Sequence, residues 1–236
     1  MNEPDLLILQ QRVGSAVQLG GFFHRGSSGY LCPDCKERLE RITGKTCGIC
    51  GRPLEHLDAK YVSGNICYDC VRWEEDPEWK GVLRENRSLY LYNAFLKELI
   101  SRFKFRGDYA LAKAFAEDVK QAVNRLDYDV LAPIPLSGER HYERGFNQSE
   151  ALLVEAGFKR APLLEGIHGE KQSKKSRTER IRLKQVFRVK KEADVAGKKI
   201  LLVDDIYTTG STLRHAAKAL KEAGARSVSS FTLARG

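Results

Sequence analysis

Apolar and polar positions form their clearest pattern in the carboxyl-terminal part of the chain. Residues 200–203 are continuously apolar after Lys199, which is typical of a strand buried on both faces of a parallel sheet. A turn over residues 204–210 leads into a helical pattern, and Gly224 suits the position just past a helix end. Residues 226–233 are expected to form the next strand. Strand, helix and strand with short connections make a right-handed βαβ unit.

The middle of the chain repeats this alternation of strand and helix patterns. Residues 87–92 have a strand pattern, and Asn93 is suited to cap the helix that follows. This helix is expected to end at residues 105–108. Further elements are expected as a helix over residues 109–123, a strand over 128–132 and a helix over 149–156. This order of elements predicts an α/β fold built on a doubly wound parallel sheet.

All six cysteines lie in the amino-terminal part of the chain as three Cys-x-x-Cys pairs. The pairs are Cys32 with Cys35, Cys47 with Cys50, and Cys67 with Cys70. Two such pairs supply four thiolates to one tetrahedral zinc ion, and the spacers between the pairs fit a zinc ribbon. Gly51 closes the second pair and allows the positive φ that such a turn favours. Disulfides and a redox pair are the alternatives, but reduced thiols are expected in the cytoplasm and no βαβ context surrounds the cysteines.

The second and third pairs are the better candidates for a closed, structural zinc site. We expect its ligands to be Cys47, Cys50, Cys67 and Cys70. Cys32 and Cys35 then form a half-site, completed by His24 or His56 or free of metal. Residues 73–79 are acidic and rich in turn formers, so a linker or the exit from the ribbon is expected there. The chain thus divides into a ribbon region (residues 1–80) and an α/β domain (residues 81–236).

Composition and charge restrict the class of protein. The chain has 236 residues, of which 42% are hydrophobic and 30% charged, unlike a disordered polyampholyte. No apolar run approaches the roughly 18 residues that span a bilayer, and the amino terminus lacks the shape of a signal peptide, so a cytoplasmic protein is expected. Residues 171–199 hold twelve Lys or Arg against three acids, which equals the whole net charge of +9. Such a run is either a solvated loop or a surface for phosphates or polyanions.

The turn after residues 199–203 carries the most informative chemistry. Asp204 and Asp205 precede a run of hydroxyls and amides that opens a helix, namely Thr208, Thr209, Gly210, Ser211 and Thr212. A loop between a parallel strand and a helix N-terminus is a favourable anion site. Two carboxylates beside a phosphate are reasonable if they hold the hydroxyls of a sugar, directly or through Mg²⁺. The run therefore predicts a site for a ribose 5-phosphate unit, and a capped helix without a ligand is the simpler alternative.

Residues 200–212 resemble the motif with which type I phosphoribosyltransferases bind phosphoribosyl pyrophosphate (PRPP). Matches over most of the chain extend this resemblance to the ComF family, at residues 105–108, 132–135, 144–148, 172, 178–180 and 233–235. Members of that family join a cysteine ribbon to a phosphoribosyltransferase-like domain. One departure is that many members begin with a further Cys-x-x-Cys pair, which residues 6–17 lack.

The resemblance implies roles for particular residues. It implies that Mg²⁺ and PRPP bind at Asp204, Asp205 and residues 208–212, and that residues 171–184 form the loop that folds over the diphosphate. It also implies that a second loop lies near the diphosphate, and the residues expected there are Arg140, Arg144 and Asn147. An arginine can contact two phosphate oxygens at once, which suits it to this position.

Three functions are compatible with these sequence features. The first is a competence protein that binds PRPP and single-stranded DNA and assists DNA uptake in natural transformation, with DNA-uptake proteins such as a helicase as partners. The second is an active phosphoribosyltransferase of nucleotide metabolism, in which an acceptor displaces pyrophosphate from PRPP. The third is a scaffold without chemistry. We favour the first, because no segment that would select a nucleobase is recognisable in the sequence.

Overall fold

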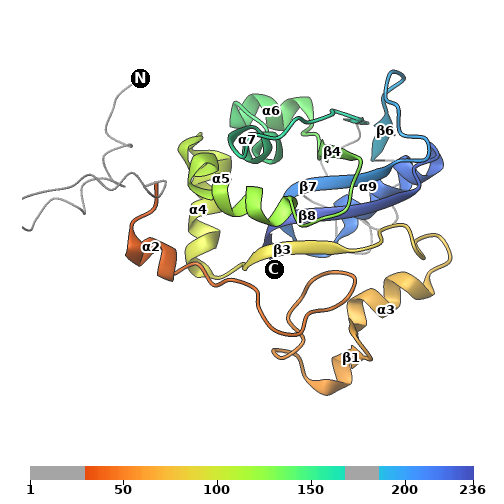
Figure 1. The fold of residues 1–236 in the computed structure, drawn as a ribbon, viewed down its shortest axis with the longest axis horizontal. Helices are drawn as coiled ribbons and strands as arrows, with labels where there is room; N and C mark the ends of the chain where they lie inside the picture. The colour runs from red at the N-terminus through yellow and green to blue at the C-terminus, as the bar shows by residue number, and fades with distance from the viewer. Residues whose placement is uncertain (1–29, 168–185) are drawn as a thin grey trace, which may run out of the picture.

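The computed structural model describes residues 30–167 and 186–236, which form a central sheet with helices on its faces and a smaller cysteine-rich lobe beside it (Figure 1). The four strands of the sheet are all parallel. Across the sheet their order is β3 (Asn86–Leu91), β8 (Ser227–Arg235), β7 (Lys199–Tyr207) and β4 (Val130–Pro133). The longer helices are α4 (Ala94–Phe105), α5 (Ala110–Val123), α7 (Gln148–Glu155) and α9 (Ser211–Glu222), with the short α6 (Gly138–Arg144) after β4.

Alternate residues of the central strands point into two separate hydrophobic clusters. On one face Leu201 and Val203 of β7 pack with the apolar sides of α4, α5 and α7. On the other face Ile200 and Leu202 pack with α9 and with the four buried cysteines of the lobe. The sheet is therefore covered on both faces, which confirms the predicted α/β fold and explains why residues 200–203 of β7 are continuously apolar.

The cysteine-rich lobe consists of short elements around two chain turns. They are the 3₁₀ helix η1 (Ala59–Tyr61), β1 (Val62–Ser63), β2 (Ile66–Cys67) and α3 (Tyr68–Glu75). The short helix α2 (Pro33–Glu37) lies apart from them, near α4 (Figure 1). A second small sheet, away from the lobe, pairs β5 (Leu164–Gly166) with β6 (Phe187–Val189) in antiparallel register. Gly51 has φ of 69°, as the predicted turn after Cys50 requires.

The predicted elements are confirmed within a few residues, with one informative difference in β7. The turn was expected from residue 204, yet the strand continues through Tyr207, because Asp204, Ile206 and Tyr207 pair with Thr232, Ala234 and Arg235 of β8. The acidic pair therefore belongs to a rigid strand rather than to a turn. Only residues 208–210 form the bend that precedes α9.

Of the two alternatives for residues 73–79, a linker is wrong, because both tryptophans of this segment are buried. Trp73 and Trp79 are 6% and 2% exposed, and their rings meet edge to face with centroids 5.4 Å apart. Trp79 also contacts the ring of His215 on α9, at a centroid distance of 4.7 Å. Both tryptophans anchor the segment to the α/β domain, because burial of large aromatic side chains is strongly favourable while the neighbouring acids stay at least partly exposed.

Three described cations of the basic run form ion pairs away from the loop that follows β7. Lys199 begins β7, about 26 Å along the strand from Tyr207, and its ammonium lies 2.8 Å from Asp127. Lys198 pairs with Asp194 at 2.6 Å, and Arg188 with Glu165 at 2.7 Å. These cations are neutralised locally. Residues 171–184, which form the predicted diphosphate loop, lie outside the described residues.

Candidate functional site

The two predicted carboxylates lie at the carboxyl end of β7, with different partners. Asp204 Oδ1 accepts hydrogen bonds from Ser149 Oγ at 3.1 Å and from the amide of Asp205 at 2.9 Å. Asp205 is buried, and its Oδ2 lies 2.6 Å from Lys104 Nζ. Burial, and then the adjacent Asp205 carboxylate, raise the pKa of Asp204 to about 7. The pair thus combines one neutralised carboxylate with one that changes charge near neutral pH.

Arg144 is the predicted diphosphate residue that lies near this acidic pair. Its Nη1 donates to Gln148 Oε1 at 2.9 Å, and its guanidinium lies 5.6 Å from the centre of the Phe105 ring. Burial lowers the pKa of Arg144, and the Asp205 carboxylate acts in the opposite direction. Its Nε is buried without a hydrogen-bond partner among the described residues. Arg140 lies exposed on the first turn of the same helix, α6.

Asn147 is committed to the local fold. Its Oδ1 accepts from the amides of Ser149 and Glu150 at the start of α7, and its Nδ2 donates to the carbonyl of Ile134 at 2.9 Å. The side chain is 8% exposed. Asn147 therefore orients the loop between β4 and α7, and a contact with a diphosphate stays a prediction.

The hydroxyl-rich loop lies between the acidic pair and α9. Gly210 has φ of 78° and ends the bend, and a Cβ there would lie 2.1 Å from Tyr207 Oη, so only glycine fits. The amide of Ser211 approaches Thr209 Oγ1 at 3.4 Å, and Thr208 and Thr212 are exposed. Gly210, at the start of α9, supplies no side-chain cap of its own to the helix N-terminus, which carries a partial positive charge. The loop has the form of an anion site.

The four cysteines expected to bind zinc converge in the structure. Cys47, Cys50, Cys67 and Cys70 are buried, and their sulfur atoms all lie within 4.8 Å of one another. The Cys50 and Cys67 sulfurs are 3.6 Å apart, close to the roughly 3.8 Å edge of a tetrahedron with Zn–S bonds of about 2.3 Å. The amides of Cys50 and Cys67 point at the sulfur of Cys47, and hydrogen bonds from the other three thiols hold the pKa of Cys47 well below its usual range.

Two buried arginines support a metal at this site. Arg214 is 0% and Arg235 3% exposed, and Arg235 Nη2 lies 3.4 Å from Cys50 Sγ. Nε of both residues, and Nη2 of Arg214, have no hydrogen-bond partner among the described residues. Two buried cations need compensating negative charge. Zinc bound by four thiolates carries a net charge of −2, which balances them, so the residues fit a structural zinc ion.

Cys32 and Cys35 stand apart from this cluster. Cys32 caps α2 and accepts from the amide of Cys35 at 3.4 Å, which holds the pKa of Cys32 below its usual value. Cys35 packs against the cluster that contains α4 and α5, on the other face of the sheet from the four buried cysteines. Among the described residues the first pair joins no cluster of three or more metal-ligating side chains. His24 lies outside the described residues.

Sequence reasoning missed several residues that surround the site. Lys104 was not singled out in the sequence, yet it pairs with Asp205, 101 residues away. Arg214 was not singled out either, although it is fully buried, and Arg235 was included in the family resemblance without a role. The short local patterns of the sequence carried no signal for these contacts, because each depends on the packing of distant elements.

Two family models match two separate parts of the chain. Residues 94–236 match the family model described as Phosphoribosyl transferase domain, and residues 24–71 match the Double zinc ribbon domain. In the part of the chain that the structure describes, no helix has the length and apolar character to cross a membrane.

Three curated relatives cover most of the chain. Competence protein ComFC of Bacillus subtilis is 44% identical over 87% of this chain and 84% of its own length. Competence protein ComFC of Streptococcus pneumoniae is 38% identical over 89% and 90%, and DNA utilization protein YhgH of Escherichia coli K12 is 27% identical over 87% and 90%. The predicted resemblance is confirmed: with its zinc ribbon and its phosphoribosyl transferase domain, the chain belongs to the ComF family and is similar to ComFC.

Proposed function

We propose that this protein takes part in the uptake or handling of DNA during natural transformation and binds Mg²⁺ and PRPP at the carboxyl end of its sheet. The names of the relatives, competence protein and DNA utilization protein, support the first part. The second part rests on one observation, which is that Asp204 and Asp205 lie directly before the glycine-bent loop of residues 208–212, with Arg144 beside them.

The arrangement suits a sugar that carries a phosphate at one end and a diphosphate at the other. Carboxylates accept hydrogen bonds from vicinal hydroxyls or ligate Mg²⁺ through water. The loop and the start of α9 offer amides and hydroxyls to a phosphate. Arg144 and the exposed Arg140 offer guanidinium groups to a diphosphate on the other side of the pair. When bound, Mg²⁺ would supply charge neutralisation between diphosphate and carboxylates.

Calorimetric titration with Mg²⁺ and PRPP tests the ligand. We expect the double variant Asp204→Asn, Asp205→Asn to weaken binding at least tenfold, because amides cannot neutralise Mg²⁺. Asp127→Asn is the matched control, since that carboxylate pairs with Lys199 at the far end of β7. Equal affinity of the double variant and the control would contradict the proposed site.

Binding of oligothymidylate tests the role in DNA handling. Contacts from lysine and arginine to a phosphate backbone predict affinity that falls as salt rises. Complementation of a Bacillus subtilis strain that lacks ComFC, scored by transformation frequency, tests the biological role. Absence of both DNA binding at low salt and complementation would contradict it.

Turnover of PRPP is the second candidate function. The pKa of about 7 for Asp204 supports it, because a carboxyl that titrates near neutral pH is suited to proton transfer. Release of pyrophosphate, measured with a panel of nucleobases and with single-stranded DNA as acceptors, would separate an enzyme from a binding protein.

A further inference from the structure

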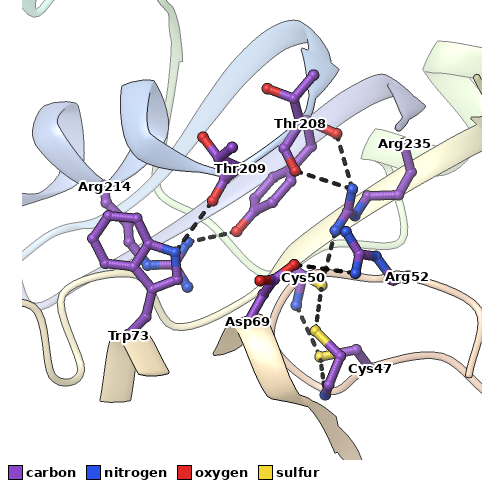
Figure 2. A network of polar contacts seen from close by, with 11 residues as sticks. Cys47, Cys50, Arg52, Asp69, Trp73, Thr208, Thr209, Arg214 and Arg235 are labelled. Atoms are coloured by element: carbon purple, nitrogen blue, oxygen red, sulfur yellow. Dashed lines mark hydrogen bonds and ion pairs between the residues drawn. The ribbon is translucent and has the colours of Figure 1, made fainter. Parts of the chain in front are cut away.

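The cysteine-rich lobe contacts the backbone of the candidate phosphate loop directly (Figure 2). Arg235 Nη1 donates to the carbonyls of Tyr207 at 3.2 Å and Thr208 at 3.1 Å, while its Nη2 lies 3.4 Å from Cys50 Sγ. The indole N–H of Trp73, on α3, donates to the carbonyl of Thr209 at 3.2 Å. Three consecutive carbonyls are thus held, two by Arg235 of β8 and one by Trp73 of the lobe.

These contacts fix which way the loop amides face. The described peptide bonds are all trans, and in a planar trans peptide each carbonyl points opposite to the N–H of the following residue. The Thr208 and Thr209 carbonyls, held by Arg235 and Trp73, therefore turn the amides of Thr209 and Gly210 away from these side chains. The Tyr207 carbonyl accepts from Arg235 and also from the Gly236 amide at 3.0 Å, which turns the Thr208 amide away from the end of β8. These are the amides of the candidate anion site.

The residues that hold the carbonyls are themselves rigid. The Arg235 guanidinium lies 4.8 Å from the centre of the Tyr207 ring, and Tyr207 Oη accepts from Arg214 Nη1 at 2.5 Å. The Arg214 guanidinium in turn lies 4.6 Å from the centre of the Trp73 ring. Arginine and aromatic side chains packed in this way stabilise each other when desolvated. The lobe and the loop are joined by one continuous buried stack.

We propose that Arg235 and Trp73 are positioning residues. Through them, the lobe with its cluster of four cysteines holds residues 207–210 in the conformation that binds an anion. The anchoring itself is independent of the ligand, and only its effect on affinity rests on the proposed function. The metal would act on the ligand site from a distance, since it fixes the Cys50 thiolate that Arg235 contacts.

Substitution of Trp73 by phenylalanine isolates one of these contacts. Trp73→Phe removes the N–H but keeps an aromatic ring for Arg214 and Trp79. Trp79→Phe is the matched control, because Trp79 packs against Trp73 but meets the ring of His215 edge to face instead of donating a hydrogen bond to the loop. Arg235→Lys keeps the charge but cannot bridge two carbonyls and a sulfur, so it provides an independent variant.

Hydrogen–deuterium exchange of the full chain without ligand is the primary measurement. We expect faster exchange of amides 208–210 in Trp73→Phe and Arg235→Lys, no change in Trp79→Phe, and a zinc content equal to that of the unaltered protein. Affinity for Mg²⁺ and PRPP should fall about three- to tenfold in Trp73→Phe, the effect expected of one lost hydrogen bond. Unchanged exchange in both variants would overturn the proposal. Faster exchange in a protein that does not bind PRPP would uphold it and contradict the proposed ligand instead.

Discussion

Gly210 is the residue whose backbone most directly constrains the site. Its φ of 78° belongs to the left-handed region, and a Cβ would lie 2.1 Å from Tyr207 Oη and 2.4 Å from Arg214 Nη1. Because both atoms belong to buried side chains, they cannot move away cheaply. We expect Gly210→Ala to lower the free energy of unfolding by about 3 kcal/mol, which combines backbone strain with overpacking.

Gly107→Ala is the control for backbone strain alone. Gly107 has φ of 65°, but no atom lies within 4 Å of an added Cβ. Its substitution should cost only about 1 kcal/mol. Equal costs for the two variants in urea denaturation would show that the contacts of Gly210 with Tyr207 and Arg214 do not matter.

The raised pKa of Asp204 predicts how ligand binding depends on pH. The group is largely protonated below its folded pKa of about 7, and a ligand with Mg²⁺ requires the carboxylate. Affinity for Mg²⁺ and PRPP should therefore rise with pH through this range, by at most about tenfold per pH unit, and level off above it.

The same pKa has the opposite effect on stability. The unfolded pKa is 3.8, so between that value and about 7 the folded chain binds more protons than the unfolded one. The free energy of unfolding without ligand should therefore fall as pH rises through this window. Titration of affinity and of urea midpoints from about pH 5 to 8 checks both, and Asp204→Asn should flatten both curves. Affinity that falls with rising pH would contradict the assignment.

At the scale of single residues, sequence reasoning found groups whose chemistry is local. The spacing of the four cysteines and of the acidic pair identifies them in the sequence, and the structure brings the cysteines together as predicted. Lys104 and Arg235 could not be found in this way. Their partners lie on other elements, and a lone lysine or arginine in an amphipathic segment has the same pattern whether it is solvated or buried.

Among the elements, α7 shows how a residue can serve the fold where the family pattern suggests a ligand. Asn147 caps α7 and also binds the carbonyl of Ile134. Asn147→Ala should lower the free energy of unfolding by about 2–3 kcal/mol, since it removes a cap and leaves a buried carbonyl unpaired. Asn147→Asp keeps the cap and should lose about half of this.

Denaturation and calorimetry on the same two variants separate the alternatives. A structural role predicts that loss of stability and loss of affinity follow the same order, with alanine the worse substitution. If Asn147→Ala kept full stability but lost PRPP binding, the residue would contact the diphosphate directly, as its sequence context predicts.

Element boundaries were predictable where periodicity ended at a glycine, and less so where tertiary pairing extended a strand. Gly224, with φ of 94°, follows α9 as expected. Strand β7 runs on past its apolar residues because the polar Asp204 and the aromatic Tyr207 pair with the end of β8. No local pattern specifies such an extension, since it depends on the length of the neighbouring strand.

At the scale of the whole molecule, the ribbon and the α/β domain share a hydrophobic cluster. The four cysteines pack with residues of β7 and α9, and Asn86 of β3 donates to the carbonyl of Cys50 at 3.3 Å and accepts from Ser230 Oγ of β8 at 2.8 Å. The spacing of the cysteines and of the apolar residues predicted a division of the chain at residue 80. Such spacing reveals ligand sets and element types, but it does not reveal which surfaces pack together.

This shared cluster predicts that zinc removal affects the whole chain. Without metal the four thiols lose their cross-link, and Arg214 and Arg235 stay buried without compensating charge. Scanning calorimetry of the zinc-loaded protein should give a single cooperative transition, and a strong chelator should move that transition down by about 10 °C or more rather than split it. Cys32→Ser, which alters the pair outside the cluster, should leave both the transition and its response to the chelator nearly unchanged. Two separate transitions, of which only the smaller responds to the chelator, would mean that the ribbon folds independently of the sheet, and the continuous stack from Cys50 to Trp73 could then not hold the loop beside Asp205.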